Sequence, residues 1–256
     1  MKLFKNFILA VAALASPLTF TSCIGDSDEN SAEQTIVALY KSDGTFEQYG
    51  GTILTPKTSV VATPGMYTFE VRYNPGDADA SGNMPVEVIS SLTSIDNANL
   101  GPSNAEPVPN IPMYSLNYQS NQGSVAPYKF NNDYLIVPAM FWVENVSSSE
   151  IQVEINKHTF ALTYLLGDDN NIKVTEDGVL DLYLTDNVAD VTTTRARFTS
   201  NFEAFYVGKL VKLYNAQYPN NGLQKFRIHA YVNGDECSMD GAATKAEYYD
   251  VQYTVK

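Results

Sequence analysis

Hydrophobic and polar residues alternate with a period of two along most of this chain. In residues 67–73 the aromatic and aliphatic side chains fall on one face, and the same alternation recurs at 180–185, 226–232 and 251–255. Because successive side chains of a strand point to opposite faces, this pattern is typical of antiparallel sheets with one buried and one hydrated face. Turn sequences separate the segments, including Asn74-Pro75-Gly76 and Asn233-Gly234. The sequence therefore predicts an all-β fold, with a spacing that suits a barrel or a sandwich.

Residues 197–214 allow two interpretations. Large aromatic and aliphatic residues recur there at close to helical spacing, which favours a short helix. The β-branched run at 191–194 just upstream, and Gly208 in the middle of the segment, favour strands instead. We expect strands, with the helix as the open alternative.

The segment from residue 101 to residue 112 is rich in proline, with Pro102, Pro107, Pro109 and Pro112. Each proline removes a backbone donor, so this stretch cannot form a central strand. We expect an inter-domain linker at 101–112, between a smaller β unit at 34–100 and a larger β unit at 113–256. A chain of 256 residues is long enough for two domains that each have a core.

The first 22 residues have the pattern of a cleaved export signal. Lys2 and Lys5 precede an apolar stretch at 7–18, which is shorter than the ~20 residues that cross a bilayer. The segment ends in Phe20-Thr21-Ser22-Cys23, which resembles the lipobox of bacterial lipoproteins. The resemblance implies that Cys23 is lipidated and anchors the protein to the bacterial outer membrane. An ordinary secretory signal with an incidental Cys is the alternative.

Residues 23–33 have the composition of an acidic tether after the lipidated Cys. The segment carries Asp26, Asp28, Glu29 and Glu33 and few apolar residues, so a disordered spacer is predicted. Acidic residues at this place also resemble the surface-export signal of Bacteroidota lipoproteins. Both the surface-exposed and the periplasmic location therefore stay open.

The charge of the chain excludes one class of partner. Its 16 Lys and Arg residues stand against 29 Asp and Glu residues, a formal net charge of -13. Such a protein is poorly suited to bind phosphate backbones or an anionic membrane face. We expect no nucleic acid partner, and contact with the membrane only through the lipid on Cys23.

Candidate catalytic residues are few. The sequence has no HExxH, CxxC, GxSxG or P-loop motif, and its only histidines are His158 and His229. We interpret His158 as a structural residue at the end of a strand and His229 as a solvated or interface side chain. Cys237 lies among acidic residues, which would raise the pKa of its thiol. We expect no catalytic residue, cofactor or metal; a hydrolase that uses paired carboxylates is the alternative.

The string Asp77-Ala78-Asp79-Ala80-Ser81-Gly82 matches the opening of an EF-hand calcium loop. Such a loop ends in a bidentate Glu at position twelve, where this chain has Val88. A polar hairpin loop is therefore the preferred interpretation, with calcium binding left open.

Several stretches taken together resemble the NigD-like lipoproteins of the Bacteroidota. The lipobox and the strand at 67–73 come first, and the larger share of the resemblance lies in Tyr134-Leu135-Ile136-Val137, His158-Thr159-Phe160-Ala161-Leu162, Leu180-Asp181-Leu182-Tyr183-Leu184 and Phe226-Arg227-Ile228-His229-Ala230-Tyr231. The resemblance implies an OB-type barrel followed by a β-sandwich. It brings no catalytic residue, because none of these stretches is a catalytic signature.

The expected function follows from the predicted membrane anchoring and from the aromatic residues of the chain. The 17 Tyr and 12 Phe residues could supply stacking platforms for glycans, and an OB-type barrel offers a groove, although strand aromatics more often pack in cores. We expect a non-enzymatic binding or structural module that presents its surface to a protein or glycan partner.

Overall fold

The computed structural model describes residues 31–120 and 123–253. The signal peptide, Cys23 and most of the tether lie outside the described residues. The chain divides into two compact units, and each is described by itself. The first holds the residues up to Asp96 together with Gln119–Val125, and the second holds Asn97–Tyr118 and the residues from Ala126 onwards.

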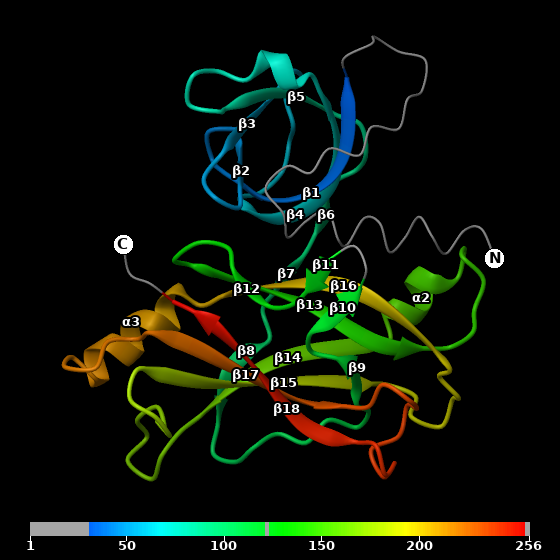
Figure 1. Cartoon of the computed structure of the whole chain (residues 1–256), viewed down its shortest axis with the longest axis vertical. Helices are drawn as coiled ribbons and strands as arrows, with labels where there is room; N and C mark the ends of the chain where they lie inside the picture. Colours follow the sequence, from blue (N-terminus) through cyan, green and yellow to red (C-terminus); the bar gives the residue numbers. More distant parts are fainter. Residues whose placement is uncertain (1–30, 121–122, 254–256) are drawn as a thin grey trace. The chain divides into compact units, whose positions relative to one another are not determined.

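The first unit is a closed five-stranded barrel (Figure 1). Its strands run in the order β1-β2-β3-β5-β4, and β4 pairs back with β1 to close the barrel. All pairs are antiparallel except β3 with β5. The elements are β1 Ala32–Tyr40, β2 Phe46–Gln48, β3 Ile53–Pro56, β4 Gly65–Tyr73, the 3-10 turn η1 Pro75–Asp77, β5 Met84–Val88 and β6 Thr93–Ser94. The barrel predicted for this part of the chain is confirmed.

Alternating buried and exposed side chains along the strands form the core of the barrel. On β4, Tyr67, Phe69, Val71 and Tyr73 are buried, whereas Glu70 between them is exposed. Their inward side chains meet those of the other strands in one cluster that includes Ile36, Phe46, Leu54, Met84 and Val86. Burial of these side chains stabilises the barrel by about 1.5–3 kcal/mol for each large one.

The second unit contains a ten-stranded sheet that curls around its own core. The path runs β7-β16-β13-β9-β17-β15-β14-β8, with β12 paired to β13 and β18 paired to β17. Its strands are β7 Asp96–Asn97, β8 Leu100–Ser103, β9 Met113–Ser115, β12 Tyr128–Lys129, β13 Tyr134–Val143, β14 His158–Leu165, β15 Val179–Val188, β16 Arg197–Tyr206, β17 Lys225–Val232 and β18 Lys245–Gln252. A separate hairpin consists of β10 Tyr118–Ser120 and β11 Gly123–Val125.

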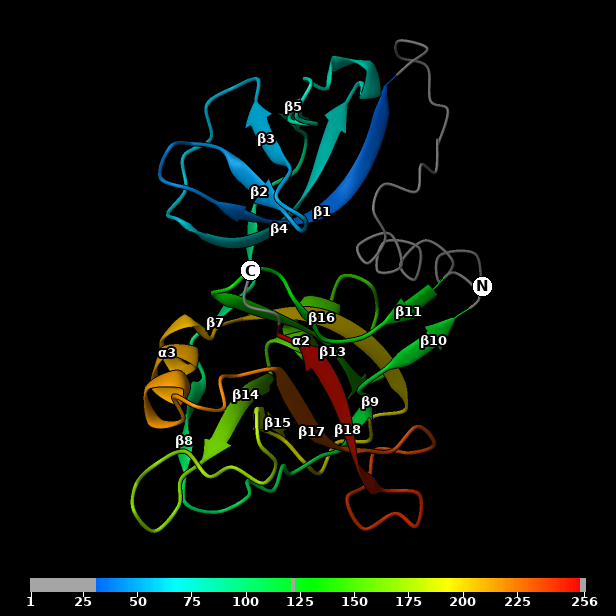
Figure 2. The same ribbon diagram turned by 60° about the vertical axis from the view of Figure 1, so that its left-hand side comes forward.

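The sheet forms two facing layers, which confirms the sandwich-like second domain. Figure 1 shows β12, β13 and β16 in one layer and β14, β15, β17 and β18 in the other. Figure 2 shows β17 and β18 side by side, as their antiparallel register requires. Buried side chains from both layers meet in one cluster that includes Leu135, Phe141, Leu162, Leu182, Leu184, Phe226 and Ile228. Among the described residues, no helix is long and apolar enough to span a bilayer.

The structure corrects the prediction of a linker at 101–112, because this proline-rich segment belongs to the second unit. Strand β8 pairs in parallel with β14, and Pro102 lies within it. Proline is tolerated because β8 is the last strand of the path, where one side of the ladder has no neighbour. At the two ends of this pair, Leu162 N donates to Asn99 O and Leu166 N donates to Ser103 O, so neither bond involves Pro102.

Two further boundaries differ from the sequence prediction. Strand β1 begins at Ala32, so Glu33 is part of the barrel and not of the tether. Its carboxylate lies 2.6 Å from Arg72 Nη2, across the β1–β4 pair. Residues 197–214 are strand only as far as Tyr206; the rest is the helix α3, Gly208–Gln217.

Gly208 begins the helix instead of breaking it. A Cβ atom at Gly208 would lie 2.2 Å from Oδ1 of Asp133, so only glycine fits this first helical position. The helix then buries Leu210, Val211 and Tyr214 on one face at helical spacing. The other helix, α2 Ile151–Ile155, is a short turn before β14.

Candidate functional site

A row of three aromatic side chains crosses the outer face of the second unit. The strand registers place Tyr183 of β15 next to His229 of β17, and His229 next to Tyr248 of β18. The rings of Tyr183 and His229 stack with centroids 4.8 Å apart at 14°, and the His229 and Tyr248 centroids are 6.0 Å apart. Tyr248 is 61% exposed. We call these three residues the aromatic row.

A row of charged side chains lies two residues along the same three strands. Here the register places Asp181 beside Arg227, and Arg227 beside Asp250. Arg227 Nε donates to Asp250 Oδ1 at 2.9 Å, and Arg227 Nη1 lies 3.0 Å from an oxygen of Glu176. Lys225 Nζ donates to the other oxygen of Asp250 at 2.7 Å.

The two rows are joined by direct contacts. His229 Nε2 lies 2.7 Å from Asp181 Oδ1, and the Arg227 guanidinium lies 4.9 Å from the centroid of the Tyr248 ring, as in a cation–π pair. Thr175 Oγ1 donates to the second oxygen of Asp181. Rings and charges therefore form one connected surface whose side chains hold one another in place.

The contacts set the charge state of this surface. Burial alone would raise the pKa of Asp181, but its hydrogen bonds with His229 and Thr175 outweigh burial, so this pKa is lowered. The hydrogen bond from Arg227 lowers the pKa of Asp250. Burial, with the nearby charges of Glu106 and Asp181, raises the pKa of Tyr183 to about 12. At neutral pH both aspartates are therefore ionised and Tyr183 keeps its proton.

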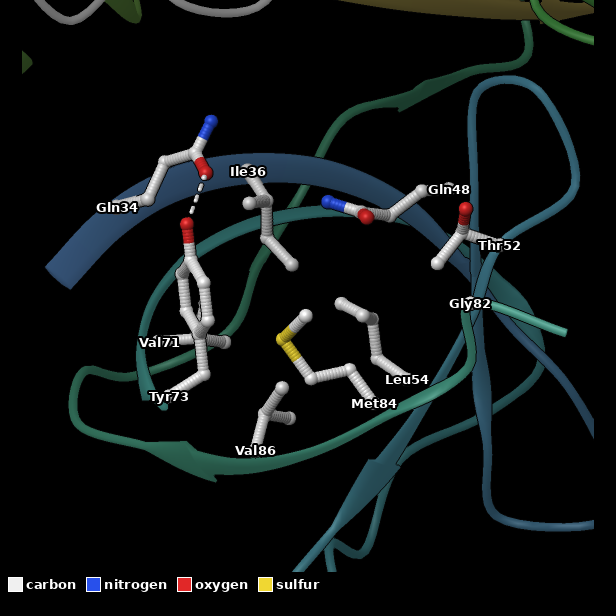
Figure 3. A pocket seen from close by; sticks show the side chains of 10 residues that line it. All are labelled: Gln34, Ile36, Gln48, Thr52, Leu54, Val71, Tyr73, Gly82, Met84 and Val86. Atoms are coloured by element: carbon white, nitrogen blue, oxygen red, sulfur yellow. Dashed lines mark hydrogen bonds between the residues drawn. The ribbon is translucent and has the colours of Figure 1, made fainter. Parts of the chain in front are cut away.

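The barrel of the first unit has a hollow at one end (Figure 3). Its inner wall is apolar, and Figure 3 shows Ile36, Leu54, Met84 and Val86 pointing into it. Its rim is polar but uncharged: Gln34, Gln48, Thr52 and Tyr73, whose hydroxyl donates to Gln34 Oε1 at 3.4 Å. The hollow measures about 320 Å3, a volume that includes space open to solvent. Its enclosed part has room for water-sized groups only.

A buried ionic network surrounds His158, which is the first residue of β14. Its Nδ1 lies 2.9 Å from an oxygen of Asp186, and both side chains are fully buried. Glu154 Oε1 accepts from Arg195 Nε at 3.1 Å and lies 3.8 Å from His158 Nε2. Lys157 Nζ lies 2.7 Å from the other oxygen of Glu154. The predicted structural role of His158 at a strand end matches this position.

Two buried carboxyl groups near this network have raised pKa values. Burial raises the pKa of Glu203 to about 7, against hydrogen bonds from the side-chain amides of Asn97 and Asn201 at 2.7 and 2.9 Å. Burial also raises the pKa of Asp186, opposed by its hydrogen bond with His158. A shifted carboxyl pair is one mark of an acid–base site. Yet Asp186 is 0% exposed and Glu203 9% exposed, so neither meets a substrate in this structure.

The other residues singled out from the sequence have structural surroundings. Burial raises the pKa of the Cys237 thiol to about 11, with a smaller contribution in the same direction from Asp186. In the Asp77–Gly82 loop, Asp79 Oδ1 accepts from the backbone N–H groups of Ser81 and Asn83, both at 2.8 Å. The loop joins the antiparallel strands β4 and β5, as a hairpin interpretation predicts. In the part of the chain that the structure describes, no three His, Cys, Asp or Glu side chains are grouped as metal ligands.

The sequence placed His229 correctly on the face of Arg227 and Tyr231, opposite the core. It did not identify Tyr183, Asp181, Tyr248 or Asp250 as neighbours of His229. The signal was partly present, because Asp181 and Tyr183 occupy polar positions of an alternating segment, whereas Tyr248 and Asp250 precede the segment at 251–255. The parallel pairing of β15 with β17, across a long connection, is what the alternation could not supply.

No known family profile matches the chain, and no curated protein matches it. Solved structures do. A putative lipoprotein from Bacteroides fragilis NCTC 9343 has a TM-score of 0.73 and 24% sequence identity, over 87% of this chain and 98% of that one. An uncharacterized protein from Parabacteroides merdae ATCC 43184 has a TM-score of 0.52 and 12% identity, over 87% and 99% of the two chains. A NigD-like immunity protein from Bacteroides caccae ATCC 43185 has a TM-score of 0.43 and 12% identity, over 90% and 93%.

The first of these comparisons extends over both units. Because almost the whole of the Bacteroides fragilis protein is matched, the chain shares the succession of barrel and larger β domain, and not one domain alone. The all-β fold of a barrel followed by a larger β domain, expected from the sequence, is thereby confirmed. This chain has the two-domain, all-β fold of the putative lipoprotein from Bacteroides fragilis.

Proposed function

We propose that the mature chain is a lipid-anchored binding protein of the bacterial outer membrane, of the NigD-like type, that presents the aromatic row of its second unit to a protein or glycan partner. The observation that carries the proposal is the exposure of Tyr248, at 61%, beside side chains that are fixed in position. Large rigid aromatic side chains and arginine are the residues on which binding energy concentrates. Their fixed positions reduce the entropy that binding costs.

Anchoring is supported by the N-terminal sequence. The predicted export signal at 1–22 is followed by Cys23 in a lipobox-like segment. The fold shared with a putative lipoprotein from Bacteroides fragilis is consistent with membrane anchoring through a lipid. Several acyl chains on one residue hold a protein stably at a bilayer without a membrane-spanning segment. The acidic tether then sets the folded units away from the membrane surface.

We propose binding in preference to hydrolysis. A glycosidase needs two carboxyl groups that flank a substrate, with room for water or a sugar between them. The two carboxyl groups whose pKa burial raises, Asp186 and Glu203, are closed off from solvent. Beside the aromatic row, Asp181 is buried and Asp250 is partly exposed. Both have lowered pKa values and accept hydrogen bonds from neighbouring side chains, which does not suit a general acid at neutral pH.

A capture experiment tests this function. The purified lipoprotein is immobilised and exposed to solubilised envelope proteins and to a mixture of cell-surface glycans. We expect retention of a defined partner without chemical change to it. Turnover of a glycan, with no retained partner, would refute the binding function.

A further inference from the structure

The aromatic row stands beside an unusual concentration of charge. Four carboxylates border it, namely Glu106, Glu176, Asp181 and Asp250, and two cations, Arg227 and Lys225. Every one of these groups has a partner at hydrogen-bond or ion-pair distance. The surface is therefore both polar and preorganised, and its charge is negative when the four acids are set against the two bases.

This charge pattern selects against two kinds of ligand. An anionic ligand would meet more carboxylates than cations, and the whole chain carries a net charge of -13. A protein hot spot needs a core that loses its water, and interface cores are depleted of charged residues. Asp181 is already buried, and covering the other five charged groups with an apolar protein surface would remove their hydration at high cost.

A sugar ring suits the same surface. Its hydroxyl groups donate to carboxylates and accept from guanidinium groups, so they replace the water that these groups lose. Its C–H face carries partial positive charge and packs on the negative face of an aromatic ring. Glu176, with a side chain 54% exposed, and Tyr248, at 61%, offer both kinds of contact.

The dimensions agree with a short oligosaccharide. Adjacent strands lie about 4.8 Å apart, and side chains on the same face of a strand lie about 7 Å apart. The two rows on β15, β17 and β18 therefore cover an area about as large as two sugar rings. Arg227 joins them, because its guanidinium lies 4.9 Å from the Tyr248 centroid and 2.9 Å from Asp250.

From these contacts we infer that the aromatic row binds an uncharged oligosaccharide, with one sugar ring packed on Tyr248 and its hydroxyl groups bonded to Glu176, Asp250 and Arg227. The inference rests on the proposed function and names its ligand class. Uronic acids and sulfated glycans are excluded ligands, because their charge has the sign of the site.

The test compares matched oligosaccharides on the purified full-length lipoprotein, held in a detergent without a sugar headgroup. Neutral hexose and N-acetylhexosamine tetrasaccharides and their uronic-acid counterparts are titrated calorimetrically. We expect binding of a neutral member, weakened roughly tenfold or more by Tyr248→Ala and retained by Tyr248→Phe, which keeps the ring. The control is Tyr49→Ala, which removes a comparably exposed tyrosine from the first unit and should leave binding unchanged.

Each other outcome decides a different point. Binding only of uronic-acid oligosaccharides, or of no oligosaccharide at all, overturns the inference. If Tyr248→Ala then abolishes capture of a protein, the proposed binding function stands while its glycan ligand does not. If Tyr248→Ala changes neither glycan binding nor protein capture, both fall. Glu176→Gln, which alters an exposed side chain, supplies a second test should Tyr248→Ala fold poorly.

Discussion

The guanidinium of Arg227 lies 4.9 Å from the centroid of the Tyr248 ring while its Nε donates to Asp250. One side chain thus holds an exposed aromatic ring and a carboxylate in a fixed relation. Arg227 and Tyr248 are on neighbouring strands, and neither is next to the other in the register, so the contact depends on the length of the arginine. The proposed recognition surface of the second unit is organised around Arg227.

Replacing Cys23 with Ala should move the protein from the membrane fraction to the soluble fraction. The lipid is the only membrane contact that the account assigns, and without it no acyl chain is buried in the bilayer. Fractionation followed by immunoblotting measures the change. A protein that stays with the membrane after Cys23→Ala would refute lipid anchoring.

The stability of the protein should fall as the pH rises between about 4.5 and about 7, through the contribution of Glu203. Burial raises its pKa from 4.5 in the unfolded chain to about 7, so the folded state binds the proton more tightly within this window. The stabilisation from protonated Glu203 is complete below the pKa of this residue in the unfolded chain. It is lost as the pH rises through the pKa of Glu203 in the folded protein. The loss is on the order of 3 kcal/mol.

Urea unfolding over this pH range measures the effect. Other groups titrate in the same range, so the result is read as the difference between the wild-type protein and Glu203→Gln. The glutamine has no proton to lose, and its profile should lack the decline. Parallel profiles for the two proteins would contradict a raised pKa for Glu203.

Replacing Glu154 with Gln should destabilise the second unit by roughly 3–5 kcal/mol. The change leaves Arg195, whose side chain is 1% exposed, without the carboxylate that accepts from its Nε. The midpoint of urea unfolding measures this loss. Glu70→Gln, the same substitution at an exposed strand position, is the control and should leave the midpoint in place. Equal midpoints for the two variants would show that the buried ion pair contributes little.

Replacing Gly208 with Ala should cost about 1–3 kcal/mol, because the new Cβ would lie 2.2 Å from Asp133 Oδ1. Gly101 offers a matched control, since a Cβ there meets nothing within 4 Å. Gly101→Ala should be neutral or slightly stabilising. Thermal unfolding of both variants tests this, and a stable Gly208→Ala protein would mean that Asp133 moves aside without cost.

Much of the fold could be predicted from alternation. The buried faces of β4 and β17 are those that the period of two assigns, because a half-buried strand leaves this trace in its sequence. On β15 the buried leucines are assigned correctly, but Asp181 and Thr185, which the alternation placed on the hydrated face, are buried as well. The proline-rich segment misled the prediction, since composition does not tell an edge strand from a linker. Gly208 also misled the prediction. Its low helix propensity favoured a strand, but in the structure Gly208 is the first residue of α3, where the side chain of Asp133 approaches its Cα closely.

The candidate site was less accessible to prediction. His229 was assigned to the correct face, but its neighbours come from a parallel pair, β15 with β17, whose register no local pattern specifies. The buried partner of His158, Asp186, is 28 residues away along the chain and meets it only in the folded unit. Long-range pairing is what the alternation leaves undetermined.

Oxidative footprinting of the complex with the captured partner tests the central claim most directly. Tyr248 and Tyr49 are exposed to similar extents, at 61% and 57%, in different units, so they report on two surfaces in one experiment. Binding at the aromatic row predicts that the partner protects Tyr248 from oxidation and leaves Tyr49 as reactive as in the free protein. Protection of Tyr49 with Tyr248 unchanged would contradict the assignment of the binding surface.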